Sequence, residues 1–271
     1  MGSQLNKCEV FSLLHQQEQA FVIPNPWDLG SAKLLQGLGH KALATTSAGL
    51  AFTLGRLDGN VTLEETLTHC TELAEHTNIP INVDFENGYS DDPEVVAKNV
   101  LALVETGVAG CSIEDFCSDT GAIYSFDLAI ERVQAATEAI ASLEMPFQLT
   151  ARAENLFHGL DDLEDTIKRL IAFESVGANV LYAPGINSLK QLTEVTNELQ
   201  SPFNVLAPFI GGASVKEFSD AGAKRISVGG ALCFAAVNPI LKAGNEMLLE
   251  GTFDWMNEIA PRNAVNDLLS S

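Results

Sequence analysis

The strongest constraint on the fold of this chain is a pattern of eight short apolar runs, each followed by a turn and then by an amphipathic segment. The runs are Phe21–Asn25, Ala42–Ser47, Ile81–Glu86, Gly110–Asp115, Phe147–Ala153, Asn179–Gly185, Phe203–Phe209 and Arg225–Gly230. Their length suits strands that are buried on both faces of a parallel sheet. Because strand and helix patterns alternate along the chain, the sequence predicts the α/β class.

Helical periodicity fills the segments between the runs. Apolar residues recur every three or four positions in residues 63–74, 95–104, 130–143 and 163–176. Asp92 and Pro93 mark a helix start, and Gly107 and Gly177 follow helix ends. Eight such units predict a closed (β/α)8 barrel, a fold that uses about 250 residues. An open doubly wound sheet is the alternative, but the first run ends in residues 24–26, Pro-Asn-Pro, and lacks a G-x-G-x-x-G turn.

The chain continues well beyond the last run. No linker or low-complexity tract interrupts the units, so we expect residues 1–271 to form one domain with a helical extension over residues 231–271. Residues 231–249 form a long, largely apolar helical pattern, which is more apolar surface than one outer helix needs. We therefore expect this extension to pack on another subunit of a homo-oligomer.

The composition excludes several classes of partner. The formal net charge is -21, from 36 acidic and 15 basic residues, so nucleic acid and anionic membranes would be repelled. The five cysteines contain no C-x-x-C pair, which argues against a disulfide framework and a zinc ribbon. The sequence shows no signal-peptide pattern and no apolar stretch of about 18 residues. We expect a cytoplasmic protein that binds neither membranes nor nucleic acid.

Acidic side chains end two neighbouring strands, where barrel enzymes carry their active sites. Asp84 and Glu86 are two residues apart and are expected on one strand face, and Glu114 ends the next strand. Three converging carboxylates repel one another unless a positive group lies between them. Arg152 is one candidate for that group, and Mg²⁺ is the other, because Mg²⁺ binds carboxylates and retains waters that a substrate can displace. Solvated strand ends are the simpler alternative.

Four further strand ends could bind anions. Ser47, Ala48 and Gly49 offer a hydroxyl and backbone amides that suit a carboxylate. Arg152 could contact a substrate, or it could form a structural pair with Glu154. The glycine pairs at 211–212 and 229–230 follow the last two strands, where many barrels bind phosphate, although tight turns would explain them equally well.

The motifs that are missing narrow the chemistry. No lysine lies in the inner part or at the carboxyl end of an expected strand, so a Schiff-base enzyme is not expected. The histidines show no H-E-x-x-H spacing, and only His158 follows a strand end. Neither a G-x-S-x-G motif nor a P-loop occurs. Zinc hydrolases, serine hydrolases and P-loop enzymes are therefore not expected.

Four strand ends, read in order as T-S-A-G, V-D-F-E-N-G-Y, G-C-S-I-E-D and L-T-A-R-A-E, resemble those of the isocitrate lyase/phosphoenolpyruvate mutase superfamily. The resemblance runs from about residue 21 to residue 249. It implies an α/β barrel that binds Mg²⁺ or Mn²⁺ and a 2-oxo carboxylate and makes or breaks C–C or P–C bonds. It also implies exchanged C-terminal helices in a tetramer or dimer.

The same resemblance assigns roles to individual residues. It implies that Ser47, Ala48 and Gly49 hold the substrate carboxylate and that Trp27 borders the pocket. It further implies that the metal is served by Asp84, Glu86 and Glu114, and that the substrate is contacted by Arg152.

The chain departs from the lyases of this superfamily in its fourth loop. The segment Cys117–Ser125 is expected to be a lid, but it lacks the K-[KR]-C-G-H motif and supplies no Lys, Arg or His. Glu86 also stands where the superfamily usually has Asp, and Thr45 stands where the lyases have Tyr. With these departures the chain resembles a short-lid branch of the superfamily, and we expect it to cleave isocitrate slowly.

The leading hypothesis is a Mg²⁺-dependent, lyase-like enzyme that acts on a small 2-oxo acid or dicarboxylate through an enolate. Its expected catalytic residues are Asp84, Glu114 and Arg152. Phosphonopyruvate-type P–C chemistry is the second hypothesis. The third is a non-catalytic barrel that only binds a 2-oxo acid.

Overall fold

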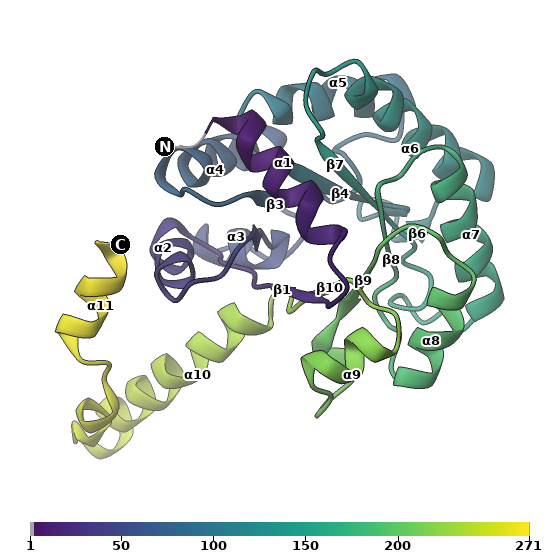
Figure 1. The fold of residues 1–271 in the computed structure, drawn as a ribbon. Coiled ribbons are helices and arrows are strands. Elements are labelled where there is room, and N and C mark those ends of the chain that lie inside the picture. Colours follow the sequence, from purple (N-terminus) through teal and green to yellow (C-terminus); the bar gives the residue numbers. More distant parts are fainter. Residues whose placement is uncertain (1–2, 271) are drawn as a thin grey trace.

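A computed structural model describes residues 3–270 and confirms the α/β barrel. Eight parallel strands form one sheet in the order β1-β10-β9-β8-β7-β4-β3-β2 (Figure 1). The two outer strands approach each other and nearly close the barrel, because the Ala44 amide donates to the Pro24 carbonyl at 3.0 Å. The strands are β1 (Phe21–Ile23), β2 (Leu43–Ala44), β3 (Ile81–Asp84), β4 (Gly110–Glu114), β7 (Gln148–Arg152), β8 (Val180–Tyr182), β9 (Phe203–Leu206) and β10 (Arg225–Ser227).

All eight expected strands are present, but each ends earlier than its apolar run. The run Phe203–Phe209, for example, becomes β9 followed by a 3-10 turn, η1 (Ala207–Phe209). The last residues of the runs leave the sheet because their side chains and backbone build the loops at the barrel mouth. Apolar composition therefore locates the strands, and the loop geometry decides where they stop.

Helices surround the barrel, and the four with predicted periodicity are confirmed as α4 to α7. Their starts are capped by side chains, as at α4, where Thr62 and Glu65 form a reciprocal capping box. The outer helices are α2 (Leu29–Gly37), α3 (Ser47–Thr53), α4 (Leu63–His76), α5 (Pro93–Val104), α6 (Phe126–Ala141), α7 (Leu163–Ser175), α8 (Leu189–Asn197) and α9 (Val215–Asp220).

An amino-terminal helix and a small hairpin of two strands were not predicted from the sequence. Helix α1 (Gln4–His15) covers the amino-terminal ends of the strands, where Phe11 is fully buried and His15 packs edge-on against Phe21. Strands β5 (Phe116–Cys117) and β6 (Ala122–Ile123) form an antiparallel hairpin within the expected lid segment. The weak amphipathicity of α1 and the shortness of the hairpin explain why neither stands out in the sequence.

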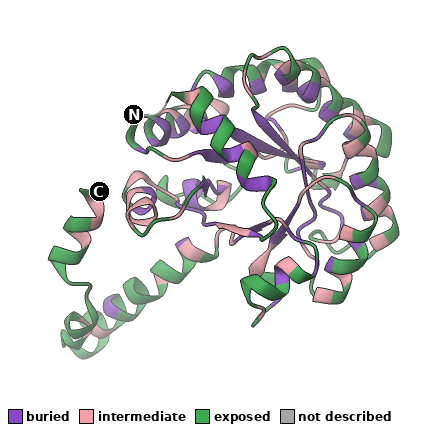
Figure 2. Ribbon diagram, in the orientation of Figure 1, coloured by how far each residue is buried: buried purple, intermediate pink, exposed green. Residues whose placement is uncertain are grey.

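The expected C-terminal extension is present and is described through residue 270, and residue 271 lies outside the described part. It contains α10 (Ala231–Asn245), a π-helical turn η2 (Glu246–Glu250), a 3-10 turn η3 (Asp254–Glu258) and α11 (Arg262–Leu269). We call residues 231–270 the arm. It projects away from the barrel and turns back so that α11 lies beside α2 (Figure 1). Figure 2 shows that the arm is mostly exposed, whereas the strands are buried.

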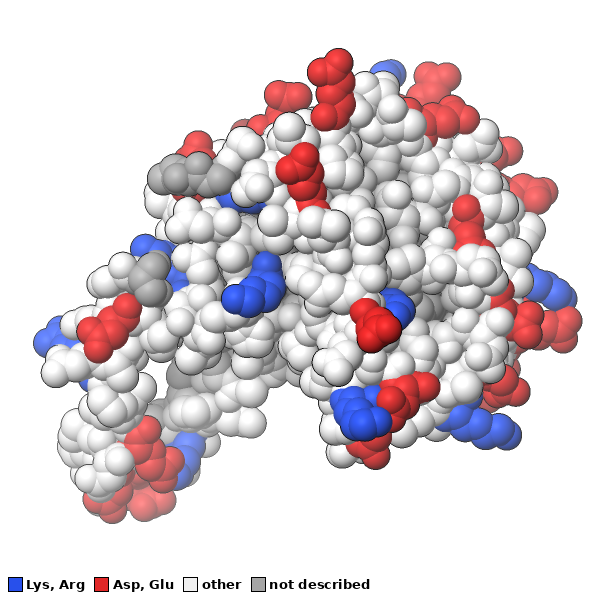
Figure 3. Space-filling model, in the orientation of Figure 1, with Lys and Arg blue, Asp and Glu red and all other residues white. Residues whose placement is uncertain are grey.

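The surface agrees with the charge balance of the sequence. Acidic side chains are scattered around the rim of the face in Figure 3, with basic ones between them. Within residues 3–270, no helix is both long enough and apolar enough to cross a bilayer.

Candidate active site

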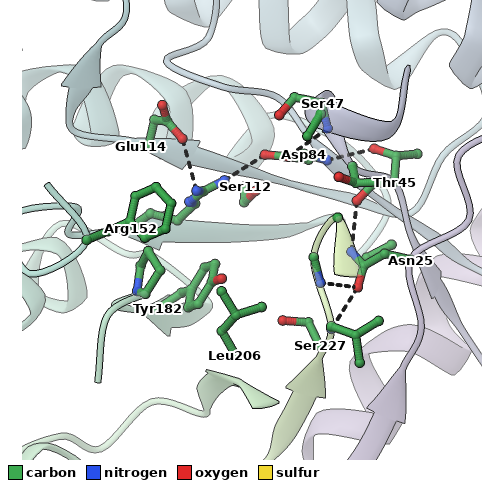
Figure 4. A pocket seen from close by; sticks show the side chains of 18 of the residues that line it. Asn25, Thr45, Ser47, Asp84, Ser112, Glu114, Arg152, Tyr182, Leu206 and Ser227 are labelled. Atoms are coloured by element: carbon green, nitrogen blue, oxygen red, sulfur yellow. Dashed lines mark hydrogen bonds and ion pairs between the residues drawn. The ribbon is translucent and has the colours of Figure 1, made fainter. Parts of the chain in front are cut away.

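A cavity of about 520 Å³ opens at the carboxyl ends of the strands, and all eight strands contribute to its lining. It brings together Ser47, Ala48, Asp84, Glu86, Glu114 and Arg152, which the sequence placed at separate strand ends. Figure 4 shows several of these side chains converging around Arg152. The titratable residues in the lining are Asp58, Asp84, Glu86, Glu114, Arg152, Glu154, His158, Tyr182 and Arg225.

Arg152 is the centre of the cluster. Its Nη1 lies 2.6 Å from Asp84 Oδ1, its Nη2 lies 3.1 Å from Glu114 Oε2, and its Nε lies 2.7 Å from Glu154 Oε1. Figure 4 shows Asp84 and Glu114 on either side of the guanidinium. Burial alone would lower the pKa of Arg152, but the three carboxylates raise it well above its usual value. The arginine therefore stays charged and keeps the acidic groups together.

The carboxylates around Arg152 are not fully compensated by its single charge. Burial raises the pKa of Glu114 well above its usual value. The neighbouring carboxylates raise this pKa further, although the pairing with Arg152 lowers it. Burial, together with repulsion from Asp84 and Asp58, also raises the pKa of Glu86 to about 7. A further positive charge in the cavity would relieve this repulsion.

Glu86 reaches the cavity by a route that corrects the sequence analysis. Strand β3 ends at Asp84, so Glu86 does not share a strand face with it. Instead, Glu86 adopts a left-handed conformation with φ of 46°, and Tyr89 has φ of 60°. Non-glycine residues rarely adopt such values, and they concentrate at functional sites. The Glu86 carbonyl accepts from the Glu114 amide at 2.9 Å, which fixes this turn against β4.

The fit of a metal ion can be judged from these donors. Within residues 3–270, no three Asp, Glu, His or Cys side chains lie close enough together to ligate one ion directly. Arg152 lies between Asp84 and Glu114, so the expected convergence of Asp84, Glu86 and Glu114 on one ion, in part through water, stays a prediction. The oxygen donors and the excess negative charge still fit a hydrated Mg²⁺, which commonly binds with few direct carboxylate ligands.

The expected carboxylate-binding turn forms the start of α3. The Ser47 amide donates to Asp84 Oδ2 at 2.9 Å, and the Gly49 amide donates to the Thr46 hydroxyl at 3.4 Å. A Cβ on Gly49 would lie 2.6 Å from Trp27 Cβ, so glycine is needed there for packing. Among the described residues, Trp27 and Gly49 do not line the cavity. Their contact with a substrate stays a prediction.

The glycine turn after β10 has a structural occupant. Asn25 Oδ1 accepts from the Val228 and Gly229 amides, both at 2.9 Å, and its Nδ2 donates to the Thr45 carbonyl at 2.9 Å. One side chain thus ties the ends of β1, β2 and β10 together. The two amides it uses are not available to a phosphate.

Two residues near the mouth, Asp58 and His158, were missed as site residues. Asp58 lies in the loop after α3 and interacts with Asp84 and Ser47. The His158 ring stacks on Phe116 with centroids 3.5 Å apart, and its Nε2 lies 3.9 Å from Glu154 Oε2. Asp58 follows no strand, so strand-end reasoning could not find it, while the position of His158 after β7 was a usable signal.

The β5–β6 hairpin borders the mouth, as expected for a lid. A Cβ on Gly59 would lie 3.5 Å from Ser118 Cβ, so the hairpin touches the loop between α3 and α4. Phe116 and Ser118 line the cavity, whereas Cys117 between them is buried and lies outside the lining. This alternation along β5 directs Cys117 away from the site.

Comparison with known proteins decides the family. A model of the phosphoenolpyruvate phosphomutase family matches residues 11–248. The chain belongs to this family. The sequence-based assignment to the isocitrate lyase/phosphoenolpyruvate mutase superfamily is confirmed, and so is the prediction that the protein is an enzyme.

Individual members of the phosphoenolpyruvate phosphomutase family and its superfamily are similar over most of the barrel. A solved structure of a provisionally assigned lyase/mutase from Burkholderia cenocepacia J2315 is 43% identical, with a TM-score of 0.94 over 99% of this chain and 97% of that chain. The 2-methylisocitrate lyase of Escherichia coli K12 is 28% identical over 63% of this chain and 60% of its own length. The oxaloacetate decarboxylase of Paraburkholderia xenovorans LB400 is 28% identical over 69% of this chain and 64% of its own length.

Proposed function

We propose that this enzyme is a lyase that cleaves a carbon–carbon bond in a small 2-oxo acid or dicarboxylate by way of an enolate. The observation that carries the proposal is the Arg152 cluster, in which one guanidinium is held by three carboxylates inside a cavity at the carboxyl ends of the strands. The names of the two relatives, a methylisocitrate lyase and an oxaloacetate decarboxylase, support small organic acids as substrates.

Arg152 retains the capacity to bind a substrate. A guanidinium has five N–H donors, and the three carboxylates engage one on each of its nitrogens. One N–H on each terminal nitrogen remains for a substrate oxygen. We expect Arg152 to hold the oxygen on which negative charge develops as the bond breaks.

The start of α3 would orient the substrate carboxylate. The Ser47 amide is engaged by Asp84, but the Ser47 hydroxyl and Ala48 border the cavity. A carboxylate placed here would lie beside Arg152, since Asp84 contacts both Ser47 and Arg152. This placement directs the rest of the substrate toward the centre of the cavity.

Asp84, Glu86 and Glu114, together with Asp58, would hold Mg²⁺ or Mn²⁺ through its bound waters. Such an ion would polarise the 2-oxo group and stabilise negative charge on its oxygen. The raised pKa of Glu86, caused first by burial and then by repulsion from Asp84, is the expected signature of a site that lacks a compensating charge.

Proton supply would come from the wall of the cavity rather than from the hairpin. The hairpin segment has no Lys, Arg or His, whereas His158 lines the cavity and is held by its stacking on Phe116. We propose that His158 donates the proton that the enolate requires, with Glu154 positioning it.

The test is a coupled assay for pyruvate with oxaloacetate and 2-methylisocitrate as substrates. Activity should require Mg²⁺ or Mn²⁺, should be lost with EDTA and should be abolished in Glu114→Gln. The ion should also raise Tm, by roughly 2–4 °C for each kcal/mol that it adds to the free energy of unfolding. Glu105→Gln, in which an acidic residue at the end of α5 is changed, is the control and should keep full activity. Metal-independent turnover, or full activity in Glu114→Gln, would refute the proposal.

Phosphorus chemistry finds less support in the site. The Val228 and Gly229 amides are occupied by Asn25, and the hairpin offers no cation to a phosphoryl group. A barrel that only binds its ligand is distinguished by the same assay, because it would form no pyruvate under any metal condition.

We also propose that the enzyme works as a homo-oligomer, a dimer or tetramer assembled through the arm. Helix α10 buries only Cys233 and Ala243 among its residues, while Ile240 and Leu241 are 65% and 58% exposed. A second copy would cover this apolar face.

A further inference from the structure

The cavity has two chemically different sides. Ser47, Asp84, Glu114 and Arg152 form the charged side, and Figure 4 shows Leu206 on the opposite side. Apolar residues of the lining come from β9, from the loops after β7 and β9 and from α10, with His158 next to them. We define the apolar wall as Phe157, Leu206, Pro208, Phe209 and Phe234.

The aromatic residues of the apolar wall stay accessible in the described structure. Phe157, Phe209 and Phe234 are 50%, 39% and 53% exposed, and the rings of Phe157 and Phe209 meet edge-on with centroids 5.8 Å apart. Three large aromatic side chains beside one cavity leave apolar area that a ligand could remove from water.

The wall is held in place by close backbone packing. Gly185, after β8, has φ of 95°, and a Cβ there would lie 2.7 Å from the Phe157 amide nitrogen. A Cβ on Gly230 would lie 3.2 Å from the Phe234 ring. Both glycines therefore let the wall residues approach the ends of the strands, and a larger side chain at Gly185 would displace Phe157.

Cations are scarce on the wall side. Among the described lining residues there is no lysine, and Arg152 is already shared by three carboxylates. Arg225 lies at the amino-terminal start of β10, where it donates to Asn204 and Thr150. His158 lies edge-on against Phe157 with ring centroids 5.3 Å apart, but burial and the Arg152 charge lower its pKa. A substrate arm that ends in a carboxylate would meet aromatic rings at the wall and would lose its hydration there.

We propose that the apolar wall is a subsite for a hydrocarbon group, so that the substrate is a 2-oxo or 2-hydroxy acid carrying an alkyl or aryl substituent. The acid end binds at Arg152, and the substituent packs against Phe157, Phe209 and Phe234. The cavity volume falls in the range of about 300–1,000 Å³ that is typical of small-molecule sites. This volume is larger than pyruvate alone requires. This inference rests on the proposed function, because it assumes that the charged side binds a 2-oxo acid.

The test measures binding rather than turnover, with the full chain and Mg²⁺ by calorimetry. The probes are pyruvate, 2-oxobutanoate, 2-oxopentanoate, 2-oxohexanoate and 2-oxo-3-phenylpropanoate. Each methylene that becomes buried should tighten binding by roughly fourfold. Two further probes have the same shape but differ in the charge at the far end. The charged one, 2-oxoglutarate, should bind more weakly than its apolar isostere 5-methyl-2-oxohexanoate.

Variants assign the effect to the wall. Phe157→Ala and Phe209→Ala should weaken 2-oxohexanoate binding at least tenfold and leave pyruvate binding within twofold. Phe126→Ala is the matched control, since Phe126 is also 39% exposed but lies outside the cavity lining. It should change neither affinity.

The outcomes separate the two proposals. Pyruvate binding without any gain along the series, or tighter binding of 2-oxoglutarate than of its isostere, would overturn the apolar subsite and leave the proposed function standing. If no 2-oxo acid binds, the proposed function fails, and the subsite fails with it.

Discussion

In the barrel, charged side chains are buried and paired, whereas in the arm apolar side chains are exposed. Asp115 is 2% exposed and meets Arg169 at 3.0 Å, and it also accepts from the Glu154 amide beside the Arg152 cluster. In the arm, Leu248 and Leu249 are 80% and 76% exposed. The contrast fits a barrel that organises chemistry within one chain and the proposed role of the arm as a surface for a second copy. Substitutions in the two regions should therefore change different measurements.

The largest expected effect is on catalysis, at Arg152. Arg152→Lys keeps the charge but replaces a planar group that reaches three carboxylates with one that reaches fewer. We expect kcat to fall by about 100-fold to 1,000-fold, the usual cost of removing one preorganised donor, with the circular dichroism spectrum unchanged. Arg56→Lys is the control, because Arg56 forms an exposed pair with Glu65. A near-normal kcat in Arg152→Lys would contradict the claim that the buried ion pairs of the barrel organise catalysis.

The next effect concerns assembly and should leave the barrel intact. Ile240→Asp combined with Leu241→Asp places charges on the exposed face of α10, where desolvating them in an interface is costly. We expect light scattering to show a shift from oligomer to monomer, with unchanged secondary structure. The control is Leu13→Asp, on the exposed side of α1, which should not change the oligomer mass measured by light scattering. A wild type that is already monomeric at micromolar concentration would contradict the proposed role of the arm.

A smaller effect concerns the pH dependence of the free energy of unfolding and arises at the amino-terminal ends of the strands, which α1 covers. Burial and the neighbouring Arg225 charge lower the pKa of His15 to about 3, against about 6.5 in an unfolded chain. Between these values only the unfolded state takes up the proton, so stability is lost as pH falls below about 6.5. One such group contributes up to about 1.4 kcal/mol per pH unit.

The His15 effect can be measured by urea unfolding at pH 5, 6 and 7. His15→Gln should flatten the pH dependence by the contribution of this one group. The exposed His76 provides the control variant, His76→Gln, which should keep the wild-type slope. Identical slopes in wild type and His15→Gln would show that His15 is not held neutral by the fold.

The smallest expected effect is at Cys117. Its side chain is buried behind the hairpin, outside the cavity lining, so Cys117→Ser should keep most of the activity, within about threefold. Phe116→Ala, one residue earlier and facing the cavity, is the comparison and should reduce activity more because it releases His158. Complete loss of activity in a folded Cys117→Ser would contradict this expectation and identify Cys117 as a catalytic residue.

Much of the barrel and part of the site could be predicted from the sequence because both depend on local patterns. Apolar runs located all eight strands, and the ends of parallel strands must meet at one edge, which placed Asp84, Glu114 and Arg152 together. The left-handed turn at Glu86 could not be foreseen, since a period of two assumes that the strand continues. Asp58 was also out of reach, because the fold of a loop over the mouth depends on tertiary contacts.

The arm shows a different limit of sequence reasoning. Its apolar content predicted contact with another subunit, which stays a prediction, and periodicity could not show that the helix would project and turn back toward α2. That path depends on the π-helical turn at η2 and on Gly251, which has φ of 68°. Such backbone events leave little trace in an apolar pattern.

The side chain of Asn25 joins β1, β2 and β10 at a place where the sheet has an open seam. Strands β4 and β7 pair along their full length, whereas the seam between β1 and β2 depends on the Ala44–Pro24 bond and on Asn25. Native-state openings begin where few backbone bonds must break. Amide exchange should therefore be fastest along this seam, and because Asn25 and Thr45 line the cavity, each opening would admit solvent through its side wall.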